Sequence, residues 1–249
     1  MTGLFAALVA FGAFALVPAI SSAHGLTDTS GGATTTVAVG SKIAGYNEPA
    51  STVKFNAGPL VVECNETTLL GKVHANPHTA GGAVLGTIED AFFRGNQVET
   101  KCKSSIDNNK GTVITVPALT QAGGTGNFSH WCIKTLPETD EFEVEPRNCT
   151  LNPPTGGEFT FLLFANGVEC GYTRTANLKG KFTTTAGAHT AGTLSLNKEQ
   201  TLTKHKGGIL CPPSGALEEF NFELFTDTAG TTPGTFRDAK NIADPIWIQ

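Results

Sequence analysis

The sequence predicts an all-β fold stapled by disulfides, a β-sandwich with a β-barrel as the alternative, built as two related halves in one compact unit. The chain has 249 residues, of which 29 are glycines. Charged residues make up only 16% of the chain. Short runs of β-forming residues alternate with Gly, Pro and Asn clusters, which is the pattern of a sandwich or barrel. Six cysteines, an even number, indicate a disulfide framework.

The predicted strands follow one another from residue 34 to residue 249. None of them shows a sustained helical period with caps at both ends. The clearest runs are TTTVAVG (34–40), STVKFNA (51–57), PLVVEC (59–64), TLLGKVHA (68–75), GTVITVPAL (111–119), FEVEP (142–146), FTFLLFA (159–165), LKGKFTTT (178–185), FNFELF (220–225) and PIWIQ (245–249). Two other segments, IEDAFFRG (88–95) and SGALEEF (214–220), are compatible with a turn or two of helix.

Two hairpins stand out among these strands. Asn166-Gly167 lies between two apolar runs, and this dipeptide favours a two-residue hairpin turn because both positions need positive φ. The segment WCIKTLPETDEFEVEPRNC predicts a second hairpin, with its turn near Leu136-Pro137.

Three short sequence motifs occur twice in the chain, once in residues 62–81 and once in residues 168–192. Each copy contains Val-Glu-Cys, Leu-x-Gly-Lys and His-Thr-Ala-Gly, and Gly71 precedes Cys102 by as many residues as Gly180 precedes Cys211. We interpret this as a duplicated β unit, with halves at about 52–102 and 159–211. Chance similarity between Gly- and Thr-rich strands is the alternative. The two glycines are expected at strand or bulge positions where a side chain would not fit.

The duplication suggests how the cysteines pair, although six cysteines allow 15 pairings in principle. Equivalent loops in the two halves would be closed by Cys64 with Cys102 and by Cys170 with Cys211, which leaves Cys132 and Cys149 to pair across their hairpin. The spacings lack the close Cys or His pairs that a zinc site needs.

The first residues indicate export. Leu4–Val17 is an apolar run followed by Pro18 and AISSA, so residues 1–23 are expected to be a signal peptide. No Lys or Arg precedes the run, and the alternatives are an uncleaved anchor and a buried apolar segment. Residues 24–34 are expected to form a flexible lead-in, and residues 35–249 the all-β domain, secreted or held at the cell surface with no membrane span in the mature chain.

The charge of the chain limits its partners. The formal net charge is −5 and no basic cluster occurs, which argues against nucleic acid and against anionic membrane surfaces. The expected partner is therefore an unknown extracellular ligand or a cell-envelope component.

Two candidate sites carry chemistry that an enzyme could use. If cleavage follows Ala23, His24 becomes the mature N-terminus, and its amine and imidazole could bind copper for an oxidase. Glu141, Glu143 and Glu145 lie on one face of a predicted strand and could serve a hydrolase or bind calcium. The alternative is an exposed strand whose charged face discourages edge pairing.

The remaining candidates have structural explanations. The histidines at 74, 78, 130 and 189 are expected in exposed loops, SIDNNKG (105–111) is expected to be a turn, and no G-x-S-x-G motif occurs. The sequence therefore predicts no catalytic residue and no cofactor.

As a set, the motifs resemble a known group. Val-Glu-Cys with Leu-x-Gly-Lys-Val, Cys170-Gly-Tyr172 with Leu-x-Gly-Lys-Phe, and Cys211-Pro212 before a closing strand are similar to uncharacterised exported proteins of soil actinobacteria, of the Solirubrobacter type. The resemblance covers roughly residues 50–249 and implies location and architecture, without an activity. The function expected from the sequence is a secreted or cell-surface, non-enzymatic binding or structural protein, with an extracellular enzyme as the alternative.

Overall fold

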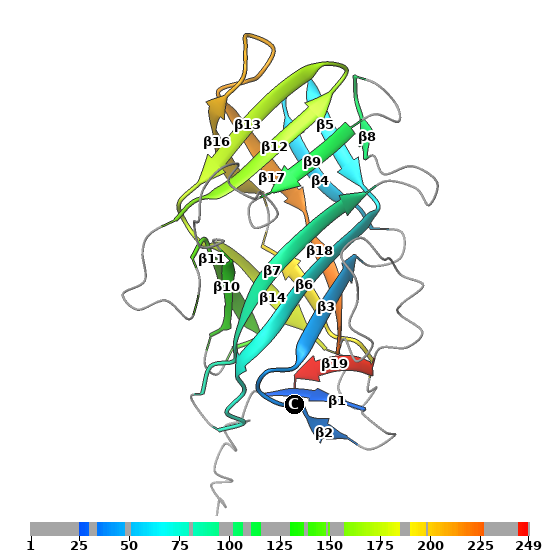
Figure 1. Cartoon of the computed structure of the whole chain (residues 1–249), viewed down its shortest axis with the longest axis vertical. Coiled ribbons are helices and arrows are strands. Elements are labelled where there is room, and N and C mark those ends of the chain that lie inside the picture. The colour runs from blue at the N-terminus through cyan, green and yellow to red at the C-terminus, as the bar shows by residue number, and fades with distance from the viewer. Residues whose placement is uncertain are drawn as a thin grey trace, which may run out of the picture.

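In the computed structural model the chain forms two curved sheets stacked along the long axis of the molecule (Figure 1). The structure describes residues 25–29, 34–47, 51–79, 82–94, 102–106, 111–115, 130–136, 139–147, 149, 157–184, 190–197, 199–226 and 244–248. Every strand pair among these residues is antiparallel.

One sheet contains a closed barrel. Its first strand, β15, also pairs with the eighth strand of the order, β18, and this pairing closes the eight strands into a ring. The barrel strands, in order around the wall, are β15 (Thr193–Leu196), β14 (Leu178–Thr183), β11 (Glu141–Glu145), β10 (Trp131–Thr135), β7 (Leu85–Arg94), β6 (Glu66–Ala75), β3 (Lys42–Asn47) and β18 (Asn221–Thr226). Alternate residues of each strand face the lumen, as in the pattern of β14, where every second residue is buried.

Three further strands extend this sheet beyond the barrel, from β18 outward: β19 (Asp244–Ile248), β1 (Leu26–Asp28) and β2 (Thr35–Thr36). β1 is buried, and the side chain of Asn76 bonds both the N–H and the C=O of Leu26, at 2.8 and 2.9 Å. The prediction of a flexible lead-in at residues 24–34 is therefore wrong for β1. Leu26 of β1 lines the lumen, so β1 covers one end of the barrel.

The second sheet, here called the distal sheet, stands at the other end of the long axis (Figure 1). Its strands, in order, are β8 (Lys103–Ser104), β5 (Leu60–Cys64), β4 (Val53–Ala57), β17 (Ser214–Glu219), β16 (Gln200–Lys206), β13 (Val168–Arg174), β12 (Phe159–Ala165) and β9 (Gly111–Thr115). A single bridge between Cys102 and Gly111 brings its two edges together, so this sheet is barrel-like too.

A shared core joins the two sheets. Trp131, from the barrel, packs edge-on against Phe159 of the distal sheet with ring centroids 5.1 Å apart, and Phe93 packs against Phe55 at 5.6 Å. Aromatic pairs with this geometry stabilise a core beyond the area that they bury. Most of the buried apolar residues of both sheets belong to one cluster.

The predicted all-β class is confirmed, and sandwich and barrel both fit sheets whose opposite walls pack face to face. The Asn166-Gly167 turn is also confirmed: both residues have positive φ, at 47° and 78°. The two possible helices are wrong, because residues 88–94 belong to β7 and residues 214–219 to β17.

The three disulfides are those that the repeat spacing predicts, Cys64–Cys102, Cys132–Cys149 and Cys170–Cys211, and no free cysteine is present among the described residues. They fit an oxidising, extracellular environment. Each predicted half contains a hairpin of the distal sheet followed by two neighbouring barrel strands, β4 to β7 in one and β12 to β15 in the other. A duplication as the origin of this likeness stays a prediction.

Candidate functional site

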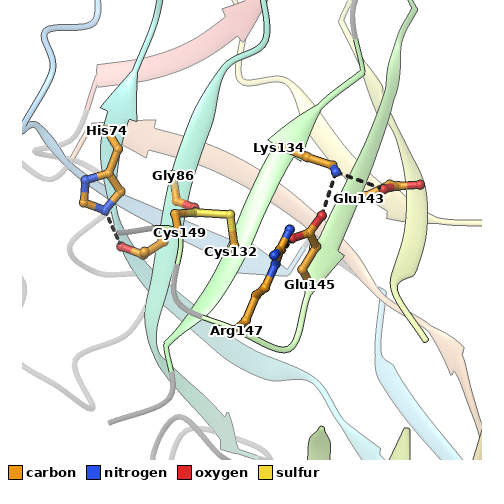
Figure 2. The surroundings of a disulfide bond; sticks show 9 residues. His74, Gly86, Cys132, Lys134, Glu143, Glu145, Arg147 and Cys149 are labelled. Atoms are coloured by element: carbon orange, nitrogen blue, oxygen red, sulfur yellow. Dashed lines mark hydrogen bonds and ion pairs between the residues drawn. A yellow bond between two sulfur atoms is a disulfide. The ribbon is translucent and has the colours of Figure 1, made fainter. Parts of the chain in front are cut away.

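The outer wall of the closed barrel carries the predicted carboxylates, beside the Cys132–Cys149 disulfide (Figure 2). β11 alternates, with Phe142 and Val144 turned into the lumen and the glutamates turned outward. β11 pairs with β10 on one side and β14 on the other. The alternative of an exposed edge strand is therefore wrong, because this strand has neighbours on both sides.

The strand register places cations opposite these carboxylates. Glu143 stands between Lys134 on β10 and Lys179 on β14, with Nζ–Oε distances of 3.5 and 2.9 Å. Lys134 also reaches Glu145 at 2.6 Å, and Arg147 bonds the other oxygen of Glu145. We call this row the charge ladder. Figure 2 shows Lys134, Glu143, Glu145 and Arg147 of this ladder close together.

The ladder keeps its carboxylates ionised. Hydrogen bonding from Lys179 lowers the pKa of Glu143, and Asn177 adds to this effect from 3.1 Å. Burial alone would raise the pKa of Glu145, but hydrogen bonds from Arg147 and Lys134 bring it below its ordinary value. A general acid in a hydrolase needs a raised pKa. The arrangement therefore favours a structural role for these carboxylates.

We expect Glu145→Gln to lower the free energy of unfolding by about 1 to 3 kcal/mol at neutral pH, because it removes the charged partner of Lys134 and Arg147. Since the folded pKa of Glu145 is depressed below 4.5, its contribution is complete above that value and disappears as the pH falls through the folded pKa. Urea unfolding of both proteins across this range measures the effect.

Glu141→Gln is the matched control, since Glu141 lies on the same face of β11 and is exposed. It should change stability by less than about 0.5 kcal/mol. Equal losses in the two variants, or a loss for Glu145→Gln that is undiminished in acid, would contradict the role given to the ladder.

The histidines at 74 and 78 were expected in exposed loops, and the structure places both in contact with other parts of the chain. His74 is half-buried on β6, with Nε2 3.0 Å from Thr87 Oγ1, and burial lowers its pKa. His78 is half-buried as well, and its Nε2 lies 3.0 Å from the C=O of Leu26, so the expectation of an exposed loop histidine is wrong for both. Within the described parts of the chain, no group of three or more His, Cys, Asp or Glu could hold a metal ion. His24 and His189 lie outside the described residues.

The lumen of the closed barrel holds an apolar cavity of about 40 Å³. All eight barrel strands line it, with Phe142, Phe182 and Leu224 among the large side chains, and Leu26 of β1 contributes at the covered end. A small-molecule site usually measures about 300 to 1,000 Å³. This cavity is therefore a small void in a packed core rather than a ligand site.

The other notable surface belongs to the distal sheet, whose connecting segments carry three exposed apolar side chains. Ile209 is 99% exposed and Leu210 is 61% exposed, in the loop between β16 and β17 that projects at the top of Figure 1. Ile106, 41% exposed, follows Ser105, whose hydroxyl donates to the C=O of Pro59. Gly58, the residue before Pro59, lies against Pro212, which belongs to the loop between β16 and β17. We call Ile106, Ile209 and Leu210 the apolar tip.

The base of the loop at 207–213 is fixed. Cys211 is buried and bonded to Cys170, and its N–H donates to the C=O of Gly208 at 3.1 Å. The hydroxyl of Tyr172 donates to the C=O of Pro212, at 3.3 Å. Gly207 has a φ of 120°. These contacts keep Cys211 buried against the sheet, while the preceding Ile209 and Leu210 are exposed.

Sequence reasoning did not identify the apolar tip. A Gly-Gly-Ile-Leu-Cys stretch contains apolar residues beside a cysteine, and such residues are usually buried. The signal that could have shown it is the Gly pair before the two apolar residues and the Pro pair after Cys211, which place them in a loop.

Comparison of the chain with protein-family models, with curated proteins and with solved structures finds no match. Among the described residues, no helix has the length and apolar character needed to cross a membrane.

Proposed function

We propose that the chain is a secreted or cell-surface, non-enzymatic binding protein that attaches to a cell-envelope component through the apolar tip. The observation that carries this proposal is Ile209, almost fully exposed on a loop whose base is fixed by a disulfide. Contiguous exposed apolar surface is typical of interaction sites, and Ile209 and Leu210 are neighbours in this loop.

Two further observations support the proposal. Three disulfides agree with an extracellular setting. The carboxylates of the charge ladder, which a hydrolase would need, are held in ion pairs with lowered pKa values. The copper-oxidase alternative depends on His24 and would require a mature chain that begins there.

Sedimentation with envelope fragments of the producing cells tests the proposal. The wild-type chain should sediment with the fragments, and the double variant Ile209→Ser/Leu210→Ser should stay in the supernatant. Val39→Ser is the matched control, because Val39 is an apolar residue with 64% exposure in the connection between β2 and β3, next to a residue that bonds the barrel strand β6. Substitutions at exposed positions change stability by only about 0.5 kcal/mol, so all the variants should fold. Binding by the double variant equal to that of the wild type would refute the proposal.

A further inference from the structure

We propose that the envelope component is the lipid bilayer, and that Ile209 and Leu210 insert into its interface while Lys103 and Lys204 face anionic headgroups. This inference rests on the proposed function, and it identifies the surface that the apolar tip contacts.

The shape of the tip favours a bilayer as the surface it contacts. The loop between β16 and β17 projects from one end of the long axis (Figure 1). Its disulfide and the hydrogen bond from Tyr172 to Pro212 fix the base of the loop, directly after the two apolar side chains. A projection fixed in this way loses little conformational entropy when it binds.

The small size of the tip also favours a bilayer over a protein partner. A stable protein–protein interface takes about 20 to 30 residues from each partner. The apolar tip offers Ile106, Ile209 and Leu210. A bilayer demands no complementary shape, and binding to it grows with the apolar area inserted and with attraction to anionic lipids. A small convex tip therefore fits a bilayer better than a protein surface.

Two lysines of the distal sheet carry positive charge that anionic headgroups would attract. Lys204 donates from Nζ to the C=O of Cys211 at 2.8 Å, so its ammonium lies at the base of the loop. Lys103 is exposed on β8, two residues before Ser105. No ion pair joins either lysine to a carboxylate among the described residues, whereas Lys206 pairs with Glu169 at 2.7 Å. Glu63 lies opposite Lys103 in the strand register.

The net charge of −5 disfavours anionic surfaces for the chain as a whole. Its effect at the tip is limited by distance, since physiological salt screens charges over about 8 Å. The charge ladder belongs to the closed barrel, at the other end of the long axis (Figure 1). An approach with the tip first therefore presents the lysines of the distal sheet to the membrane and keeps the barrel away from it.

Fluorescence tests insertion directly. Both tryptophans of the chain, Trp131 and Trp247, are buried, so a tryptophan placed at the tip reports on its own surroundings. In Leu210→Trp, vesicles of phosphatidylcholine with phosphatidylglycerol should shift the emission to shorter wavelength, and brominated lipid should quench it. In Val39→Trp, the same vesicles should cause neither change. An unshifted and unquenched Leu210→Trp spectrum would overturn the inference.

Sedimentation with the same vesicles measures how much the apolar side chains and the two lysines each contribute to binding. Ile209→Ser/Leu210→Ser should weaken binding at least about tenfold. Replacing Lys103 and Lys204 with Gln should weaken binding to the mixed vesicles by roughly fivefold for each lysine, and leave binding to pure phosphatidylcholine unchanged. Equal losses on both kinds of vesicle would contradict the role given to the lysines.

The two proposals can fail separately. If envelope fragments bind through Ile209 and Leu210 but vesicles do not, or if lipid-extracted fragments still bind, the bilayer is the wrong surface while the binding function stands. If neither fragments nor vesicles bind, both proposals are wrong.

Discussion

Replacing Cys170 and Cys211 together with alanine should lower the free energy of unfolding by about 4 kcal/mol, because the disulfide closes a loop with a sequence separation of 41 residues. Cys64–Cys102 closes a similar loop, with a separation of 38 residues, and its removal should cost about the same. Cys132–Cys149 spans only 17 residues and should cost about 3 kcal/mol. Urea unfolding of the three double variants measures these differences.

Double variants are required, since a single Cys→Ser change would leave a buried thiol free to exchange. Cys64, Cys102 and Cys170 are fully buried, so each alanine also removes packed volume, and the loss in the two longer loops could exceed the entropic figure. The decisive outcome is the order of the three losses in the free energy of unfolding. A larger loss for Cys132–Cys149 than for the two others would show that loop length does not govern the stabilisation.

Loss of the Cys170–Cys211 disulfide should also weaken attachment through the apolar tip. Cys211 follows Leu210 directly, and its buried sulfur holds the base of the loop against β13. Without that bond the loop must be ordered on binding, which costs about 0.5 to 1.5 kcal/mol per side chain immobilised. The Cys132–Cys149 variant, whose disulfide lies on the barrel wall, should keep its attachment.

Strands with an unbroken alternation could be predicted from the sequence. FTFLLFA is the clearest example, since its residues from Phe159 to Ala165 alternate between buried and half-buried positions. The Asn166-Gly167 turn could be predicted as well, because few residue pairs tolerate positive φ at two successive positions.

The two false helices share one physical cause, a β-bulge. In β7, Leu70 pairs with Asp90 and Gly71 pairs with Ile88, so Glu89 is an extra residue in the strand. In β17, Leu217 pairs with Phe55 and Glu219 pairs with Lys54, which makes Glu218 the extra residue. An extra residue shifts the next buried position by one, so apolar residues recur at a spacing of three, as they do in a helix.

The candidate site depended on information that a single strand does not contain. Glu143 and Glu145 could be placed on one face from their spacing alone. Their partners could not, because Lys179 comes from β14 and meets β11 only through the order of strands around the barrel. The exposure of Ile209 likewise follows from the tethered loop rather than from its residue type.

Gly180→Ala should destabilise the protein by about 3 kcal/mol, since an added Cβ would lie 2.3 Å from the C=O oxygen of Ser195 and 2.5 Å from the ring of Phe142. Gly71→Ala should have a comparable effect, because its Cβ would lie 2.3 Å from the C=O oxygen of Thr87. Thermal and urea unfolding measure both changes. Gly208→Ala is the control: nothing lies within 4 Å of its Cβ, and it should change stability by less than about 0.5 kcal/mol.

This pair of variants also tests the repeat. Each glycine occupies a buried position of a barrel strand, and the obstructing carbonyl comes in both cases from the next strand along the chain, β7 for Gly71 and β15 for Gly180. Two related units would keep such a close backbone approach in both copies, because only glycine permits it. Comparable losses in the two variants would support equivalent positions. A loss confined to Gly180→Ala, where Phe142 also obstructs the methyl group, would mean that the shared Leu-x-Gly-Lys words arose without a shared structural requirement.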